Sequence, residues 1–418
     1  MATPRLIHNV AALVSVQALG YVLPLITLPY VTRVLGVAGW GSVAWTLVVI
    51  NYFYTLTNWA FFWTGTRKVA TLRDDTEQLS RTFLTIYVGQ WILCAIAIAV
   101  LVILVAFVPV FHRFAAYFLF ATGLIVANVL FPVWFLTGLE MMRQIAIVQI
   151  LVRLSSVPLI FLLIKKPADA PYLVAIYAAT NVCGGILAMH WISRNVDLIW
   201  RMPKIRDVFA ELAAGSALFG TSTCIGLYST LTPTVLGIVA GPTVVGYYAI
   251  ADRVRQLVQA VTKPLSDALF PRMSHLFAKD TAAAHRLILK SSAIILPVAA
   301  LMSIVLWGAA GIIVVTVAGA KFKAAIPILR WLAPLPIVIS LSNVLGVQIM
   351  LPQQKMKAFN LIFVAASVLS LSALLPLIHW RGAEGAAMNS LGVECFVTLS
   401  MCLYLWRTGY FTAAAAAT

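Results

Sequence analysis

Charged residues are scarce in this chain, at 10% of its 418 residues, whereas 62% are hydrophobic. A soluble domain carries about 25% charged residues, so the composition excludes a protein that folds in water alone. Long apolar runs recur from one end of the sequence to the other, which excludes a single anchor on a soluble body. We expect an all-α integral membrane protein.

Motifs for catalysis, nucleotide binding and metal binding are missing as well. The sequence has no GxxxxGK[ST], HExxH or GxSxG. Its five cysteines lie singly in apolar spans, without metal-ligand spacing. The outer loops are too short to display a set of catalytic polar residues. We therefore expect neither an enzyme nor a resident cofactor or metal.

The net charge of +16 does not indicate nucleic-acid binding, because the basic residues lie in short loops between apolar spans. That pattern is the orientation signal of a membrane protein. The N-terminal MATPRLIHNV leads into a long span rather than a short apolar region with a cleavage site, so we expect the first span to stay in the protein.

About twelve spans are predicted, each long enough to cross a ~30 Å hydrocarbon core. They cover 6–32, 39–63, 82–108, 114–138, 144–164, 171–193, 211–238, 243–269, 287–317, 324–351, 358–380 and 382–406. Of the 29 Lys and Arg residues, 17 lie on the side of the N-terminus and 7 on the other side. This bias predicts that both termini are cytoplasmic.

An internal repeat divides the chain into two halves. Four residue pairs share one separation of 205 residues: Gly41 and Gly246, Arg67 and Arg272, Asp75 and Asp280, Arg81 and Arg286. We expect an N-terminal six-helix lobe at 1–195, a basic cytoplasmic linker at 196–206 and a C-terminal six-helix lobe at 207–418. An even number of helices gives both halves one orientation, with the substrate path between them.

The span 243–269 carries a polar stripe on one helical face. Its members are Asp252, Arg255, Gln256, Gln259, Lys263, Ser266 and Asp267. One charged side chain at a helix centre costs at least ~2.5–3.5 kcal/mol in lipid, so the stripe must face other helices or a wet cavity. The alternative to cavity lining is a structural network, in which Asp252 pairs with Arg255 or Arg253.

The repeat places a neutral polar stripe at the equivalent positions of the second span. Asn51, Tyr54 and Asn58 share one helical face there. A central cavity lined by both stripes would be polar on one wall and cationic on the other. Such a cavity suits an anionic solute rich in hydroxyl groups.

Two further spans contribute polar residues. Gln149, Arg153 and Ser156 share a face of the fifth span, and Arg153 is either a cavity residue or a structural one. Glu394 lies in the last span as either a proton site or a satisfied buried carboxylate. Together with Asp252, it is a candidate for coupling to H+ or Na+.

Four stretches of the sequence resemble a known family. They are PLITLPYVTRVLGVAGWGSVAW at 24–45, GTRKVATLRDD at 65–75, WFLTGLEMM at 134–142 and VGYYAIADRVRQ at 245–256. The chain resembles the Wzx-type polysaccharide flippases, a branch of the multidrug/oligosaccharidyl-lipid/polysaccharide exporter superfamily. Arg33 lies in the first stretch, and Asp252 and Arg253 lie in the last.

The resemblance implies two lobes that open to alternate sides of the bacterial inner membrane. It implies transport of an undecaprenyl-diphosphate-linked oligosaccharide for O-antigen, capsule or exopolysaccharide, with ion coupling. A polymerase and a chain-length regulator of the same pathway are the expected protein partners. Two other hypotheses stay open: a cation-coupled exporter of drugs or small metabolites, which predicts an acidic cavity, and a membrane glycosyltransferase or polymerase.

Overall fold

A computed structural model describes residues 4–260, 269, 272–273, 276–277 and 279–411. Within these residues every regular element is a helix, which confirms the all-α prediction. Nine described helices are long and apolar enough to cross a membrane. The exact number of twelve spans stays a prediction. The chain forms two compact units, Met1–Thr230 and Leu231–Thr418.

The exposed surface of these helices is apolar. Ile103 and Phe107 are 55% and 80% exposed near the end of one helix, and Leu361 is 69% exposed on another. Contiguous exposed apolar faces are rare on soluble monomers, and lipid is the solvent that accommodates them. The chain is therefore a multi-pass membrane protein.

The first unit contains the longest helix of the chain. Its elements are α1 (Pro4–Asn58), α2 (Phe61–Thr71), α3 (Thr76–Phe107), α4 (Pro109–His112), α5 (Ala115–Leu130), α6 (Val133–Gly138), α7 (Met142–Leu163), α8 (Ala170–Asn195) and the first part of α9 (Ile205–Val239). α1 covers the first two predicted spans and is kinked at Gly36, whose φ of 67° is non-helical and suits a residue without a Cβ.

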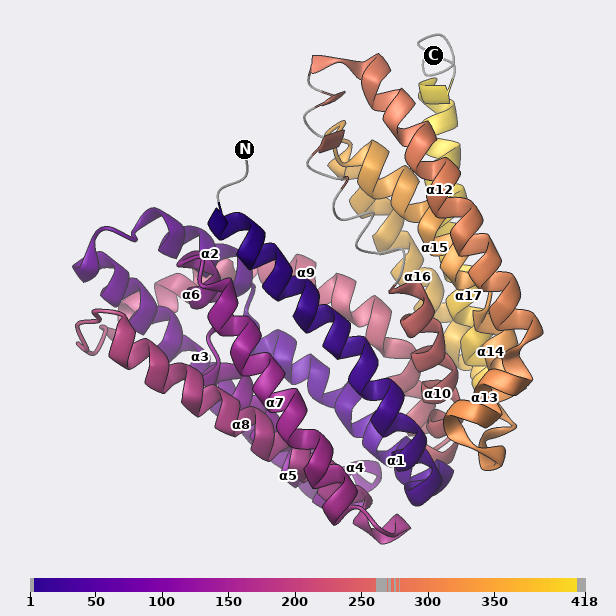
Figure 1. The fold of residues 1–418 in the computed structure, drawn as a ribbon, viewed down its shortest axis with the longest axis horizontal. Helices are drawn as coiled ribbons and strands as arrows, with labels where there is room; N and C mark the ends of the chain where they lie inside the picture. Colours follow the sequence, from indigo (N-terminus) through magenta and orange to yellow (C-terminus); the bar gives the residue numbers. More distant parts are fainter. Residues whose placement is uncertain (1–3, 261–268, 270–271, 274–275, 278, 412–418) are drawn as a thin grey trace. The chain divides into compact units, whose positions relative to one another are not determined.

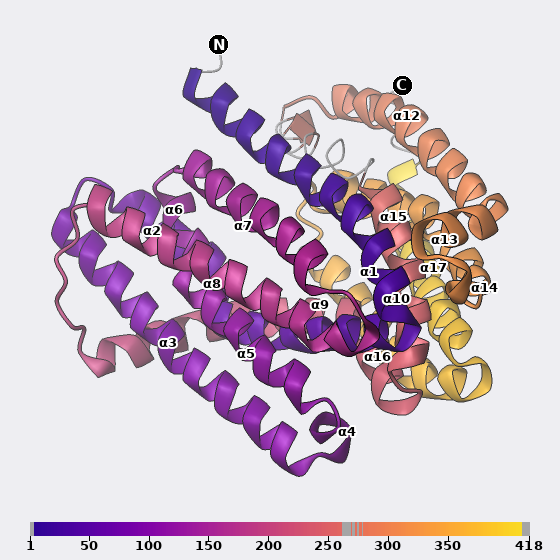
Figure 2. The ribbon, with the colours of Figure 1, turned by 60° about the horizontal axis from the view of Figure 1, so that its bottom comes forward.

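Helix pairs of the first unit enclose its core. α5 packs against α8, and α1 packs against α5 and α7. Figure 2 shows α3 and α5 side by side, with α4 at the turn between them. Phe83, Trp134 and Phe135 form part of the buried core that α3 and α6 share. The core thus holds the short helices α2 and α6 against the long ones.

The beginning of α9 is attached to α1, α2 and α3 within this unit. Lys68 pairs with Glu211 at 2.5 Å, and Arg81 pairs with Asp207 at 2.8 Å. The indole nitrogen of Trp59 donates to the carbonyl oxygen of Leu212 at 2.7 Å. By its contacts the first unit therefore extends into α9, and the division at 196–206 stays a prediction.

The second unit contains the rest of α9 and nine further elements. They are α10 (Pro242–Gln259), α12 (Thr281–Gly308), α13 (Ala310–Ala318), η2 (Ala320–Phe322), α14 (Ala325–Leu332), α15 (Leu335–Asn343), the π-helix η3 (Val344–Met350), α16 (Met356–Arg381) and α17 (Ala383–Arg407). α16 packs against α17, and α10 packs against α14 and α17. Figure 1 draws these helices in orange and yellow.

The internal repeat is visible in the backbone. Asp75 and Asp280 are both N-caps whose carboxylates accept from the backbone amide three residues later, at 2.9 and 2.8 Å. Gly241 begins α10 with a φ of 84° and corresponds to Gly36. Helix-starting carboxylates and left-handed glycines therefore recur at the separation read from the sequence.

Candidate functional site

The polar stripe of α10 forms a hydrogen-bonded network on its own helix. Arg255 Nη2 lies 2.7 Å from Asp252 Oδ1, and its Nε donates to the same oxygen at 2.8 Å. Gln256 donates to the other carboxylate oxygen at 2.7 Å, and Arg255 also donates to Gln259. The Arg255 and Asp252 side chains are 13% and 24% exposed. The structural network left open above is thus present, with Arg255 as the partner of Asp252.

Glu394 joins this network from α17. Its Oε1 accepts from the Ser342 hydroxyl at 2.8 Å, and its carboxylate interacts electrostatically with Arg255. Arg255 therefore lies in the field of two carboxylates. Ser390, one turn before Glu394, lies 3.2 Å from the Tyr248 hydroxyl on α10, which joins α10 to α17. Glu394 is a satisfied carboxylate in this arrangement.

Lys263, together with Ser266 and Asp267, lies outside the described residues. The cavity that Lys263 and Arg255 were expected to line with Asn51 and Asn58 stays a prediction. The structure instead describes two cavities inside the first unit.

The first cavity has a volume of about 390 Å³ and lies among α1, α5, α7 and α8. Its lining is Tyr54, Leu124, Ala127, Asn128, Phe131, Val133, Gln149, Val152, Arg153, Ser156, Tyr177, Thr180, Asn181 and Gly184. The polar face of the fifth predicted span therefore points into a cavity as a whole. This cavity is named the Arg153 cavity below.

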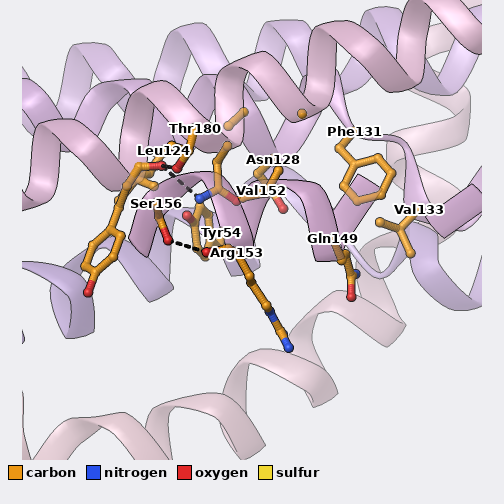
Figure 3. A pocket seen from close by; sticks show the side chains of 14 residues that line it. Tyr54, Leu124, Asn128, Phe131, Val133, Gln149, Val152, Arg153, Ser156 and Thr180 are labelled. Atoms are coloured by element: carbon orange, nitrogen blue, oxygen red, sulfur yellow. Dashed lines mark hydrogen bonds between the residues drawn. The ribbon is translucent and has the colours of Figure 1, made fainter. Parts of the chain in front are cut away.

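Hydrogen bonds fix several polar groups of the Arg153 cavity. The Asn128 amide donates to the Thr57 hydroxyl at 2.8 Å, and the Asn181 amide donates to the Tyr177 carbonyl oxygen at 2.8 Å. Figure 3 shows the Arg153 side chain extended, with its guanidinium away from the Ser156 hydroxyl. Among the described lining residues, Arg153 alone is charged. The cavity is thus cationic, with neutral donors and acceptors around it.

The second cavity, of about 370 Å³, shares Asn128, Phe131 and Val133 with the first. Its other lining residues are Thr55, Asn58, Ala60, Phe62, Trp63, Gln90, Trp134 and Phe219. It is named the aromatic cavity below. The two cavities adjoin each other along this shared wall.

Two of the predicted site residues line neither cavity. Asn51 is exposed, and so is Arg33, whose guanidinium donates to the Pro29 carbonyl oxygen at 3.4 Å. Sequence reasoning missed Asn128, Asn181 and all the aromatic residues. The spacing of Tyr177 and Asn181, one turn apart on α8, was the signal that could have found that wall.

The fold and this site define a class of protein. A multi-pass helical chain with an internal repeat and a polar cavity at membrane depth is a membrane transporter. The chain belongs to the polysaccharide biosynthesis protein family, whose model matches residues 6–277. Its family makes it a polysaccharide transporter of the flippase type, not an enzyme.

Two relatives cover nearly the whole chain, and both are named "Putative O-antigen transporter". The one from Escherichia coli (strain K12) is 30% identical and spans 95% of this chain and 96% of its own. The one from Shigella dysenteriae is 24% identical and spans 94% and 98%.

Solved structures share the fold. An inward-facing multidrug resistance transporter of the MATE family, in the MOP superfamily, aligns with a TM-score of 0.70 at 12% identity, over 96% of both chains. A second MATE multidrug transporter, solved as a complex with a small molecule, gives 0.63 at 14% identity, over 98% of this chain and 96% of the other. At these identities the likeness concerns the fold alone.

Proposed function

We propose that this protein is a flippase for an undecaprenyl-diphosphate-linked oligosaccharide in the bacterial inner membrane. In this proposal both termini are cytoplasmic, and the lipid-linked O-antigen, capsule or exopolysaccharide unit moves to the periplasmic leaflet. The names of the two relatives support a polysaccharide cargo. A polymerase and a chain-length regulator would take over the product.

The observation that carries the proposal is the lining of the Arg153 cavity. One Arg lies among neutral amide and hydroxyl groups, with no acidic residue among the described residues of the lining. A guanidinium attracts a diphosphate or an acidic sugar and can bind two of its oxygens at once. Amide and hydroxyl side chains suit sugar hydroxyls. Such a lining does not suit the cationic drugs that the exporter hypothesis requires.

Ion coupling is the second part of the proposal, and it belongs to the network of α10 and α17. Arg255 interacts with both Asp252 and Glu394. A proton or Na+ that neutralises one carboxylate would weaken its hold on Arg255 and favour another arrangement of the two helices. Coupled in this way, ion entry would drive rocking of the halves while the isoprenoid tail stays in lipid.

A complementation experiment tests the cargo. A strain deleted for the gene receives wild-type protein, Arg153→Gln or Arg330→Gln, and surface polymer and accumulated lipid-linked intermediate are measured together. Arg330 is a matched control because it lines neither cavity and stacks on Trp307 at 5.6 Å. We expect Arg153→Gln to lose surface polymer and accumulate the intermediate at normal protein level, and Arg330→Gln to retain both functions.

Two results would count against the proposal. Normal polymer with Arg153→Gln removes the role of the cavity. Unchanged polymer in the deletion strain, together with new sensitivity to cationic drugs, would support the multidrug exporter hypothesis instead.

A further inference from the structure

The aromatic cavity differs in chemistry from the Arg153 cavity. Its described lining residues are all uncharged. Five of these eleven residues are aromatic, and they come from four different parts of the first unit: Phe62, Trp63, Phe131, Trp134 and Phe219. Its volume of about 370 Å³ lies within the ~300–1,000 Å³ typical of ligand cavities.

The aromatic rings form walls rather than a filled core. Trp63 is 66% exposed and Phe62 is 44% exposed. Their ring centroids are 5.1 Å apart with an interplanar angle of 84°, so the two rings form a corner. Trp134 is buried behind them, and a Cβ on Gly65 would lie 2.7 Å from its Cε3 atom. The glycine therefore allows α2 to lie close against Trp134.

Amide side chains lie among these rings. The Gln90 Oε1 accepts from the Trp134 indole at 2.9 Å, and its Nε2 donates to the Thr57 carbonyl oxygen at 3.3 Å. These bonds hold Gln90 and Trp134 in place. The Asn128 amide nitrogen is taken by the Thr57 hydroxyl, which fixes the side chain and leaves its carbonyl oxygen to accept. Among the described residues, the Asn58 amide makes no hydrogen bond. Asn58 and Asn128 can therefore meet a ligand.

Rings and amides together match one ligand chemistry. A pyranose has a face of C–H groups that packs on an aromatic ring, and a rim of hydroxyls that bond to amides. An acyl or isoprenoid chain would use the rings but leave the amides unsatisfied at membrane depth. A diphosphate would need a cation, and the neighbouring Arg153 cavity supplies it.

We propose that the aromatic cavity is a sugar-ring subsite, in which Trp63 stacks on one pyranose of the cargo and Asn58 and Asn128 bond its hydroxyls. The wall shared with the Arg153 cavity places this ring next to the charged part of the same ligand. The assignment rests on the proposed function and refines it, because it gives the sugar its own contacts separate from those of the diphosphate.

Saturation-transfer NMR on the full-length protein in nanodiscs tests the subsite. The probe is the free oligosaccharide released by mild acid from the lipid-linked intermediate that accumulates in the deletion strain. The variants are Trp63→Ala, Trp63→Phe and the control Trp406→Ala. Trp406 is 67% exposed at the end of α17 and lines neither cavity.

Wild-type protein is expected to saturate the C–H protons of one sugar residue most strongly. Trp63→Ala should bind about tenfold more weakly, the equivalent of ~1.4 kcal/mol. Trp63→Phe should restore most of the binding, because it keeps a ring at that position, and Trp406→Ala should match the wild type. Restoration by Phe separates stacking from a merely structural role, and melting temperatures identify any variant that fails to fold.

Equal binding by wild type and Trp63→Ala would overturn the assignment. So would competition by undecaprenyl monophosphate that depends on Trp63, since the rings would then hold the lipid tail. Either result leaves the proposed function standing if the wild type restores surface polymer. A wild type that restores no polymer refutes the flippase function, whatever the NMR result for the isolated glycan.

Discussion

The Asp252–Arg255 pair offers the sharpest test of how α10 is stabilised. Asp252→Asn leaves Arg255, whose side chain is 13% exposed, without its nearest carboxylate. Removal of one partner from a buried ion pair typically costs ~3–5 kcal/mol. Here Gln259 still accepts from Arg255, and Glu394 still attracts it. We therefore expect a smaller loss of ~2–3 kcal/mol in the free energy of unfolding.

The reverse substitution should cost less. Arg255→Gln leaves Asp252 24% exposed and still bonded to the Gln256 amide at 2.7 Å. We expect a loss of ~1–2 kcal/mol. The double variant removes both charges, so it should lose less than the sum of the two single variants, with a coupling energy of ~1–2 kcal/mol.

The assay is a double-mutant cycle of unfolding by SDS in mixed micelles. Arg381→Gln is the control, because its pair with Glu384 is 3.7 Å long and the Arg381 side chain is 50% exposed, so it should cost less than ~1 kcal/mol. Single-variant losses that add within ~0.5 kcal/mol would refute the reasoning, because the two charges would then not stabilise each other.

Two further predictions concern the first unit. Gly65→Ala should cost ~1–3 kcal/mol in unfolding free energy and lower the surface polymer, because the added Cβ meets Trp134 at 2.7 Å; a melting temperature equal to that of the wild type would contradict this. Arg73 donates a hydrogen bond to Glu140 and lowers the pKa of that carboxyl. The contribution of Glu140 to stability should therefore be present above its ordinary pKa and disappear as the pH falls through the lowered pKa. Melting curves of wild type and Glu140→Gln should converge in acid, and a constant gap would exclude the effect.

Much of the fold could be predicted from the sequence, because a chain in lipid must satisfy its backbone within helices. The repeat of Asp75 at Asp280 reflects the same need for an N-cap in both halves. The kink at Gly36 was harder to predict. The structure joins two predicted spans into one helix there, and only the φ of 67° marks the break.

The candidate site was predicted in part. Periodicity placed Gln149, Arg153 and Ser156 on one face, and the structure points that face into a cavity. Periodicity also grouped Asp252 with Arg255, but it could not decide between a partner and a ligand for the guanidinium. The aromatic cavity escaped because Trp63, Trp134 and Phe219 come together through tertiary packing, and a search for polar residues in apolar spans passes over tryptophans.

The two halves of the repeat have diverged at the positions that carry the chemistry. The turns before α7 and α16 are equivalent, since Glu140 and Gln354 share left-handed φ values of 60° and 58°. This alignment places Ser367 opposite Arg153, and the Ser367 hydroxyl bonds to the carbonyl oxygen of Phe363 in its own helix at 2.8 Å.

The cationic cavity is therefore a feature of the first half, and the network of Asp252, Arg255 and Glu394 is a feature of the second. In the proposed function this divergence separates two tasks that a symmetric transporter would mix. The first half would bind an anionic, hydroxyl-rich cargo without nearby carboxylates to repel it. The second half would keep its carboxylates next to an arginine that responds when a cation binds.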